Sequence, residues 1–327
     1  MQTEQAHSSR AYPLKKEALG SGEGTPWAPQ SVGGQANQPP PQTQHPSLAE
    51  ARSPLVWLNL VCLDAPLVSV TWLWLFARTF HHSLPSASWI ALFLTAWLIY
   101  LADRLADTRS LPDDAPRSLR HQFCLRHRQL WIGGLIVIAI VDLLIIWNFL
   151  GVAIFMAGSL IGALALAHLL LNYSLGGAWP PLPLKELAVG SIFAAGTLVP
   201  LFPVFRPITN IIVLAAAIFA ALCTFNCLCI AFWEKELDKI QGKVSFATRF
   251  PTLDRHLERL LLAFGFAAGA TAVVIHQVAP ILAPASVSSF LLALLSYSGE
   301  RLSRDQRTAL ADLVLLTPIL ALTVMKP

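Results

Sequence analysis

Two pairs of acidic residues stand out because each pair has the spacing of one helical turn. Asp103 and Asp107 are four residues apart, and so are Glu234 and Asp238. Side chains four residues apart on a helix lie on one face, so each pair presents two carboxylates together. Like charges at that spacing destabilise an isolated helix slightly, which raises the question of which cation they hold.

Magnesium is the cation that such carboxylates favour. Mg²⁺ binds to one or two protein carboxylates and to the phosphate oxygens of a substrate. Two acidic pairs at one depth and on one face of a membrane protein could hold a diphosphate through this metal. We therefore expect Asp103, Asp107, Glu234 and Asp238 to be catalytic, and these four together with Glu236 to be the ligands of Mg²⁺.

Basic residues follow each acidic pair along the chain. Arg117, Arg120 and Arg126 come after the first pair, and Lys239 and Lys243 come after the second. Guanidinium and ammonium groups bind the non-bridging oxygens of phosphates, so we expect these residues to bind diphosphate. The alternative is that both acidic pairs are solvated helix ends, since cytoplasmic loops of membrane proteins are rich in Lys and Arg without any substrate.

Several polar residues lie within or beside apolar segments. Asn226 precedes Glu234 by two helical turns, so we expect it to line an acceptor cavity below the acidic site, together with Asp64 and Tyr100. A hydrogen bond between helices is the alternative role for Asn226. Asp142 and Asp312 also lie in apolar segments, where an ionisable residue usually faces the protein interior or a water-filled cavity.

The composition distinguishes a membrane protein from a soluble one. Of the 327 residues, 55% are hydrophobic and only 13% are charged, whereas charged residues make up about a quarter of an ordinary soluble domain. Residues 1–50 are rich in Gln, Ser, Gly and Pro, and we expect a disordered cytoplasmic tail there. Residues 51–327 are expected to form an all-α membrane bundle.

From residue 54 onward the sequence falls into apolar runs of about 18 to 25 residues, the length that crosses about 30 Å of hydrocarbon as a helix. We expect nine transmembrane helices, at residues 54–78, 85–103, 130–149, 152–172, 186–205, 209–233, 259–277, 279–297 and 308–325. With this topology, all but three of the 23 Lys and Arg residues lie on the face that holds the tail. The positive-inside rule makes that face cytoplasmic. The expected protein is a multi-pass protein of a bacterial inner membrane with a cytoplasmic N-terminus.

An acidic motif after the second and after the sixth of nine helices resembles the UbiA superfamily of intramembrane prenyltransferases. The first motif of that family is Asn-x-x-x-Asp-x-x-x-Asp, and Asp103 and Asp107 fill its two acidic places, while Ile99 stands in place of the Asn. The second motif is an acidic stretch followed by a Gly and a Ser, which resembles residues 234–238 with Gly242 and Ser245. Glu234 replaces the commoner Asp.

The resemblance covers residues 54–327 and implies both a fold and an activity. It implies a UbiA-like bundle in which Lys185, before the fifth helix, touches the diphosphate, although Pro181 stands where the family usually has a Tyr. The implied reaction is a Mg²⁺-dependent transfer of a prenyl group from a polyprenyl diphosphate to an aromatic or other lipophilic acceptor, on the cytoplasmic side. The implied partners are these two substrates and the lipid bilayer, and no nucleic acid.

Two other functions agree with the same residues. A transporter or channel would use Asp64, Asp142 and Asp312 as carriers of ions or protons. A catalytically silent protein would keep the bundle and lack a working site, because Ile99 cannot bind magnesium.

Overall fold

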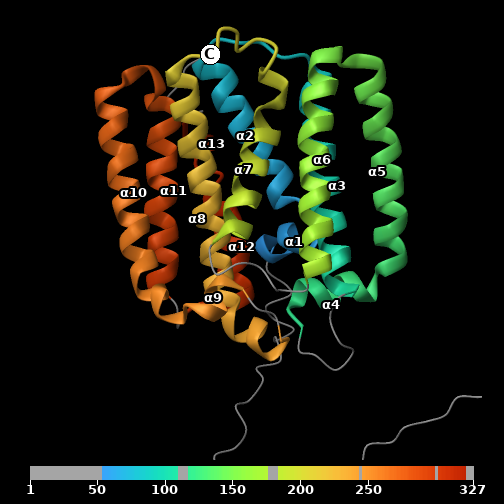
Figure 1. Ribbon diagram of the computed structural model, residues 1–327, viewed down its shortest axis with the longest axis vertical. Coiled ribbons are helices and arrows are strands. Elements are labelled where there is room, and N and C mark those ends of the chain that lie inside the picture. The colour runs from blue at the N-terminus through green and yellow to red at the C-terminus, as the bar shows by residue number, and fades with distance from the viewer. Residues whose placement is uncertain (1–53, 110–116, 176–182, 243–244, 299–300, 322–327) are drawn as a thin grey trace, which may run out of the picture. The chain divides into compact units, whose positions relative to one another are not determined.

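The computed structural model describes residues 54–109, 117–175, 183–242, 245–298 and 301–321. The chain divides into Met1–Thr43 and Gln44–Pro327, and every described residue belongs to the second unit. The described residues form helices and no strand, as expected for an all-α protein (Figure 1). The expected tail, residues 1–50, lies outside them.

Seven helical segments in the described part of the chain are long and apolar enough to cross a membrane, which indicates an integral, multi-pass membrane protein. They are α3 (Ser86–Arg109), α5 (Arg128–Phe149), α6 (Val152–Leu175), α7 (Leu184–Leu198) with η2 (Val199–Leu201), α8 (Asn210–Ile240), η3 (Pro251–Leu253) with α10 (Asp254–Val274), and η4 (His276–Val278) with α11 (Ala279–Tyr297). They coincide with the second to eighth expected spans. A helix is the form in which a single apolar segment satisfies its own backbone within lipid.

The first and last expected spans are each divided into two shorter helices, so the count of nine unbroken helices is not confirmed. The first consists of α1 (Pro54–Leu60) and α2 (Asp64–Thr79), and the last of α12 (Arg304–Val314) and α13 (Pro318–Ala321). Cys62 has a φ of 56° between α1 and α2, a left-handed conformation that ends a helix. Pro318 disfavours the helical conformation of the residue before it.

Two tryptophans donate hydrogen bonds to backbone carbonyls at these breaks. Trp97 Nε1 on α3 donates to the carbonyl oxygen of Val61 at 2.9 Å, and Trp72 Nε1 on α2 donates to the carbonyl oxygen of Leu315 at 2.8 Å. Because lipid offers no hydrogen bonds, irregular backbone at membrane depth is stable only where protein covers it. Both breaks are therefore stabilised by helices of the bundle.

The last turns of α3 and α8 extend beyond their apolar runs. They carry the two acidic pairs, which the sequence placed at helix ends. The short helices α4 (Leu119–Arg126) and α9 (Phe246–Arg249) lie at the same end of the bundle (Figure 1). We call this end, with the first turn of α12, the charged end. The described residues that follow the second and sixth expected spans at this end are thus largely helical.

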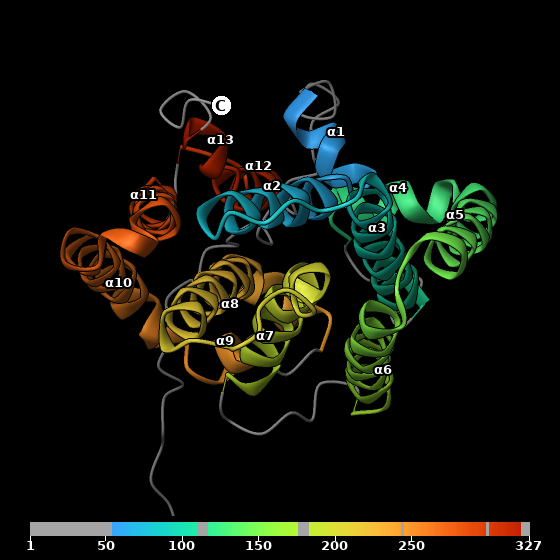
Figure 2. The ribbon, with the colours of Figure 1, turned by 90° about the horizontal axis from the view of Figure 1, so that it is seen from above.

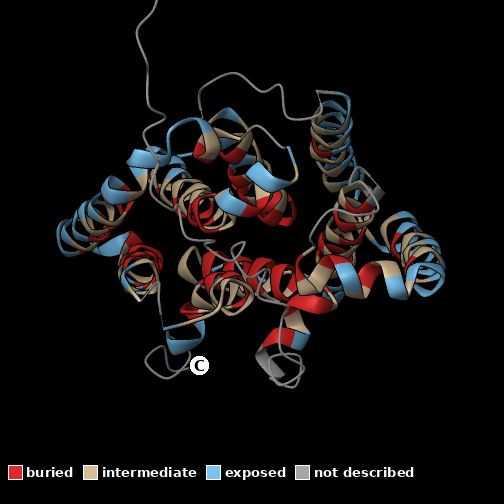
Figure 3. Ribbon diagram, turned by 90° about the horizontal axis from the view of Figure 1, so that it is seen from below, coloured by how far each residue is buried: buried red, intermediate tan, exposed pale blue. Residues whose placement is uncertain are grey.

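The central helices pack closely, and the outer ones expose apolar faces. The helices α7 and α8 lie between the α10–α11 pair on one side and the helices α5 and α6 on the other (Figure 2). A Cβ at Gly190 of α7 would lie 2.6 Å from the backbone nitrogen of Thr224 in α8, so only glycine permits this approach. Trp72 stacks on Phe219 with ring centroids 4.4 Å apart. Among the candidate spans the buried share is highest in α11 and α7, whereas α5 shows a largely exposed face suited to lipid (Figure 3).

Candidate functional site

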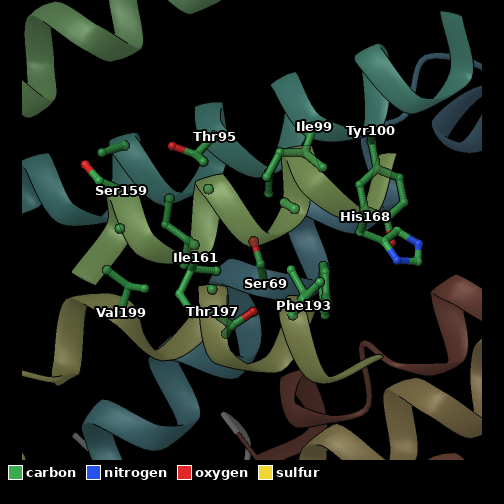
Figure 4. A pocket seen from close by; sticks show the side chains of 18 of the residues that line it. Ser69, Thr95, Ile99, Tyr100, Ser159, Ile161, His168, Phe193, Thr197 and Val199 are labelled. Atoms are coloured by element: carbon green, nitrogen blue, oxygen red, sulfur yellow. The ribbon is translucent and has the colours of Figure 1, made fainter. Parts of the chain in front are cut away.

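A long pocket of about 450 Å³ runs along α3 and is lined also by α2, α5, α6 and α7. Its lining on α3 extends from Ser88 to Asp107, a rise of about 28 Å at about 1.5 Å per residue. The hydrocarbon core of a bilayer is about 30 Å thick. Most of the wall is apolar, with Ile99, Ile161 and Phe193 among its side chains (Figure 4). The pocket therefore fits a long apolar chain.

One end of this pocket carries charged and polar side chains. Asp103 and Asp107 lie one turn apart on α3, Lys185 lies in the first turn of α7, and His168 and Asn172 come from α6. Lys185 acts electrostatically on Asp103 and on His168. The structure thus brings the first acidic pair together with Lys185, at the end of the channel that a polar headgroup would occupy.

The second acidic pair does not line this pocket. Both carboxylate oxygens of Glu234 accept hydrogen bonds of 2.7 Å from one nitrogen of Arg120, and the two side chains are only 13% and 15% exposed. Glu236 pairs with Lys239 at 2.8 Å on the surface. Asp238 also interacts with other residues. Glu234 is therefore engaged by a guanidinium group in the position where we expected it to bind a metal.

The short helix α4 connects the two acidic pairs. Arg120 binds Glu234 of α8 and also acts electrostatically on Asp103 of α3. The next residue, His121, places Nε2 at 3.8 Å from Asp107 Oδ2, while its Nδ1 lies 2.8 Å from Ser118 Oγ. Burial lowers the pKa of His121, although the contact with Asp107 opposes the shift. The sequence placed Arg120 in a loop that binds substrate, whereas the structure gives it a second role as a link between helices.

The other expected phosphate-binding cations are more scattered. Arg126 is exposed at the end of α4, and Lys239 is occupied by Glu236. Arg117 is partly buried and has interactions of its own. Lys243 lies outside the described residues. Of the expected cations that the structure describes, Lys185 alone lines the pocket.

A second polar cluster lies buried beyond the pocket wall. Asn59 Nδ2 donates to Asp64 Oδ2 at 2.6 Å and lies 3.4 Å from Asp312 Oδ2, while Asn226 Nδ2 donates to Asp312 Oδ1 at 2.8 Å. A cavity of about 20 Å³ lies beside Asn226 and Asp312. Tyr100 lines both this cavity and the long pocket. The expected cavity residues Asn226, Asp64 and Tyr100 thus lie close together, and Asn226 does bond between helices.

Sequence reasoning missed part of this arrangement. The sequence predicts that Asp312 faces the interior or carries ions, but not that it joins Asn59 to Asn226, as it does in the structure. Nothing in the spacing of His168 indicated that it would line the pocket. Asp142 accepts a hydrogen bond from Thr95 at 2.6 Å and so joins α5 to α3.

The charged end suits a Mg²⁺ ion that a substrate helps to hold rather than a cage built by protein alone. No group of three or more His, Cys, Asp and Glu side chains among the described residues is placed to hold a metal ion. Asp103 and Asp107 supply two carboxylates, the number that Mg²⁺ takes when substrate phosphates complete its shell. The larger expected set, with Glu234, Glu236 and Asp238, is not assembled.

The candidate site therefore consists of the long pocket, its acidic end and the buried cluster beyond Tyr100. Its function has to be inferred from this geometry. Among known proteins, no family model, no curated protein and no solved structure matches the chain.

Proposed function

We propose that the protein transfers a prenyl group from a prenyl diphosphate to a lipophilic acceptor in the long pocket. The observation that supports the proposal is the joining of an apolar channel to an end that holds Asp103, Asp107 and Lys185. A prenyl diphosphate has the same two parts, since a long apolar tail ends in a compact anionic head. The volume of about 450 Å³ lies within the range of small-molecule sites.

The apolar wall would bind the tail without any specific polar contact. Removal of apolar surface from water is favourable in proportion to its area, so tails of several lengths could bind. Gly158 and Gly162 of α6 leave space along this wall, because a Cβ at Gly162 would meet no atom within 4 Å. A dry channel would also keep water away from the carbon that gains positive charge as the diphosphate leaves.

The acidic end would bind the diphosphate head. Lys185 would hold phosphate oxygens directly, as an ammonium group does in many phosphate sites. Asp103 and Asp107 would repel a diphosphate on their own, so these two carboxylates would hold Mg²⁺ there. When bound, Mg²⁺ neutralises the charge that develops on the leaving diphosphate. Tyr100, one turn before Asp103, would face the acceptor.

The test uses purified protein in nanodiscs with Mg²⁺, labelled farnesyl and geranylgeranyl diphosphates, and a panel of phenolic and quinone-precursor acceptors. The variant Gly162→Phe fills the channel without a clash at Cβ. The matched control is Gly133→Phe on α5, where an added Cβ also meets nothing, but where the residue is exposed outside the pocket. Asp103→Asn removes one charge at the acidic end.

We expect Gly162→Phe to weaken prenyl diphosphate binding by about tenfold or more, because it fills the space that the tail needs. Gly133→Phe should bind as the wild type does. Asp103→Asn should lose transfer. Equal binding by both glycine variants would refute the site, and binding without transfer to any acceptor would refute the reaction.

A further inference from the structure

Four polar side chains from four helices meet at the two broken spans, three of them buried and Asp312 partly buried. Asn59 comes from α1, Asp64 is the first residue of α2, Asn226 comes from α8 and Asp312 from α12. Their exposed fractions include 2% for Asp64 and 6% each for Asn59 and Asn226. Irregular backbone at membrane depth often surrounds an ion or proton site, because it occurs where the interior is polar.

The two carboxyl groups of the cluster share one hydrogen-bond donor. Asn59 Nδ2 donates to Asp64 Oδ2 at 2.6 Å and to Asp312 Oδ2 at 3.4 Å, so the two carboxyl groups lie close together. Two adjacent negative charges in a largely buried site are costly, which favours a proton on one of them. A protonated carboxyl group can then donate a hydrogen bond to its neighbour, whereas an ionised carboxylate can only accept one.

Two cations act electrostatically on the pair. Arg104 of α3 acts on Asp64, and also on Asp103 and Asp107. Arg120 of α4 acts on Asp312, but both oxygens of Glu234 hold it. The other titratable groups around the pair are the Cys62, Cys223 and Cys227 thiols and the Tyr100 phenol, types of group that are mostly neutral at physiological pH with their ordinary pKa values. Each of the two cations is thus shared between the pair and carboxylates outside it.

A small cavity connects this pair with the long pocket. The cavity of about 20 Å³ is lined by Asp312, Asn226 and Tyr100, and it has room for about one water molecule. Asn226 Oδ1 is buried and has no hydrogen-bond partner among the described residues, so it offers an acceptor to that water. Tyr100 lines the long pocket as well.

We propose that Asp64 and Asp312 form a buried proton-binding site, and that one water and Tyr100 connect it to the long pocket. The pair holds one shared proton at rest and has one remaining acceptor position. This proton-binding site does not depend on the proposed transfer reaction. In that reaction the acceptor would lose one proton as its bond to the prenyl carbon forms and diphosphate leaves, and the pair could receive that proton.

Infrared spectroscopy of the resting protein tests the shared proton without any substrate. A protonated carboxyl group has a C=O band that shifts in D₂O, and an ordinary Asp, with a pKa of about 3.9, is fully ionised at about pH 7. We expect such a band at that pH in the wild type, shifted by ¹³C-labelled aspartate. Its complete absence from the wild type would overturn the proposal, whether or not any variant folds.

Variants assign the band to the pair. Asp64→Asn and Asp312→Asn should each remove the band component that belongs to the shared proton. Asp142→Asn is the matched control, since Asp142 is also buried in the bundle but pairs with Thr95 away from the cluster. Retention of the whole wild-type band in a folded Asp312→Asn protein would overturn the site.

Exchange kinetics test the connection to the pocket. Tyr100→Phe removes only the phenolic hydroxyl and should keep the band, while slowing its shift after transfer into D₂O several-fold. The Gly162→Phe variant, with the channel filled, should slow it as well. An unchanged exchange rate in both variants would overturn the connection through Tyr100.

Discussion

Removal of either partner from the Arg120–Glu234 pair should destabilise the protein more than any surface charge change. Both carboxylate oxygens of Glu234 lie 2.7 Å from the guanidinium, and the side chains are only 13% and 15% exposed. Breaking a buried ion pair costs about 3–5 kcal/mol because the remaining charge is left without a partner. Since this pair is partly exposed, Arg120→Met and Glu234→Leu should each cost about 3 kcal/mol.

The double variant should cost less than the sum of the single changes. When both charges are removed, no charge is left without a partner. We therefore expect a coupling energy of about 2 kcal/mol between the two substitutions. The assay is unfolding of the purified protein in micelles by a denaturing detergent, followed through the fluorescence of its 10 tryptophans. The control is the same cycle on Glu236 and Lys239, an exposed pair on α8 that should couple by less than about 0.5 kcal/mol. Equal coupling in both cycles would refute the assignment of α4 as a link between α3 and α8.

Three further predictions concern stability. Gly190→Ala should cost about 1–3 kcal/mol, since its Cβ would press on the backbone of Thr224, whereas Gly162→Ala should be nearly neutral in the same unfolding assay. Because the pKa of His121 is lowered in the folded state, the unfolded chain binds more protons as the pH falls. The free energy of unfolding should therefore be greatest above about pH 6.5 and decrease as the pH drops through the folded-state pKa. Unfolding measured over a pH series should not show this decrease in the His121→Gln variant. Thr95→Val should cost about 1–3 kcal/mol by leaving Asp142 without its donor, as thermal unfolding would show.

The spanning helices could be predicted because their physics is local. An uncharged apolar run long enough to cross the membrane satisfies its own backbone as a helix, whatever surrounds it. The acidic pair Asp103 and Asp107 was predicted for the same reason, since spacing alone puts both side chains on one face of α3, and both line the pocket.

The breaks in the first and last spans depend on distant partners. The run from Pro54 onward reads as continuous because Val61, Cys62 and Leu63, where the break falls, are as apolar as most of the run. The break exists where the indole of Trp97 can donate to the carbonyl of Val61. A hydropathy profile carries no information about that tertiary contact, so the sequence predicts one helix where the fold has two.

The second acidic pair shows the same limitation at the site. Spacing put Glu234 at a helix end, but its partner, Arg120, lies 114 residues away in the chain. The identity of that partner decides whether the carboxylate is available to a metal. The contacts of Asp312 were likewise beyond prediction from spacing, because its partner Asn59 lies 253 residues away in the chain.

The most direct test of the prenyl-binding pocket is photo-crosslinking with a benzophenone-bearing prenyl diphosphate in nanodiscs, followed by mass spectrometry. The account predicts labels on the pocket-lining parts of α6 and α7, competed by unlabelled farnesyl diphosphate and lost in Gly162→Phe. Labels confined to α10 and α11, or labels on α6 and α7 that persist in Gly162→Phe, would contradict it.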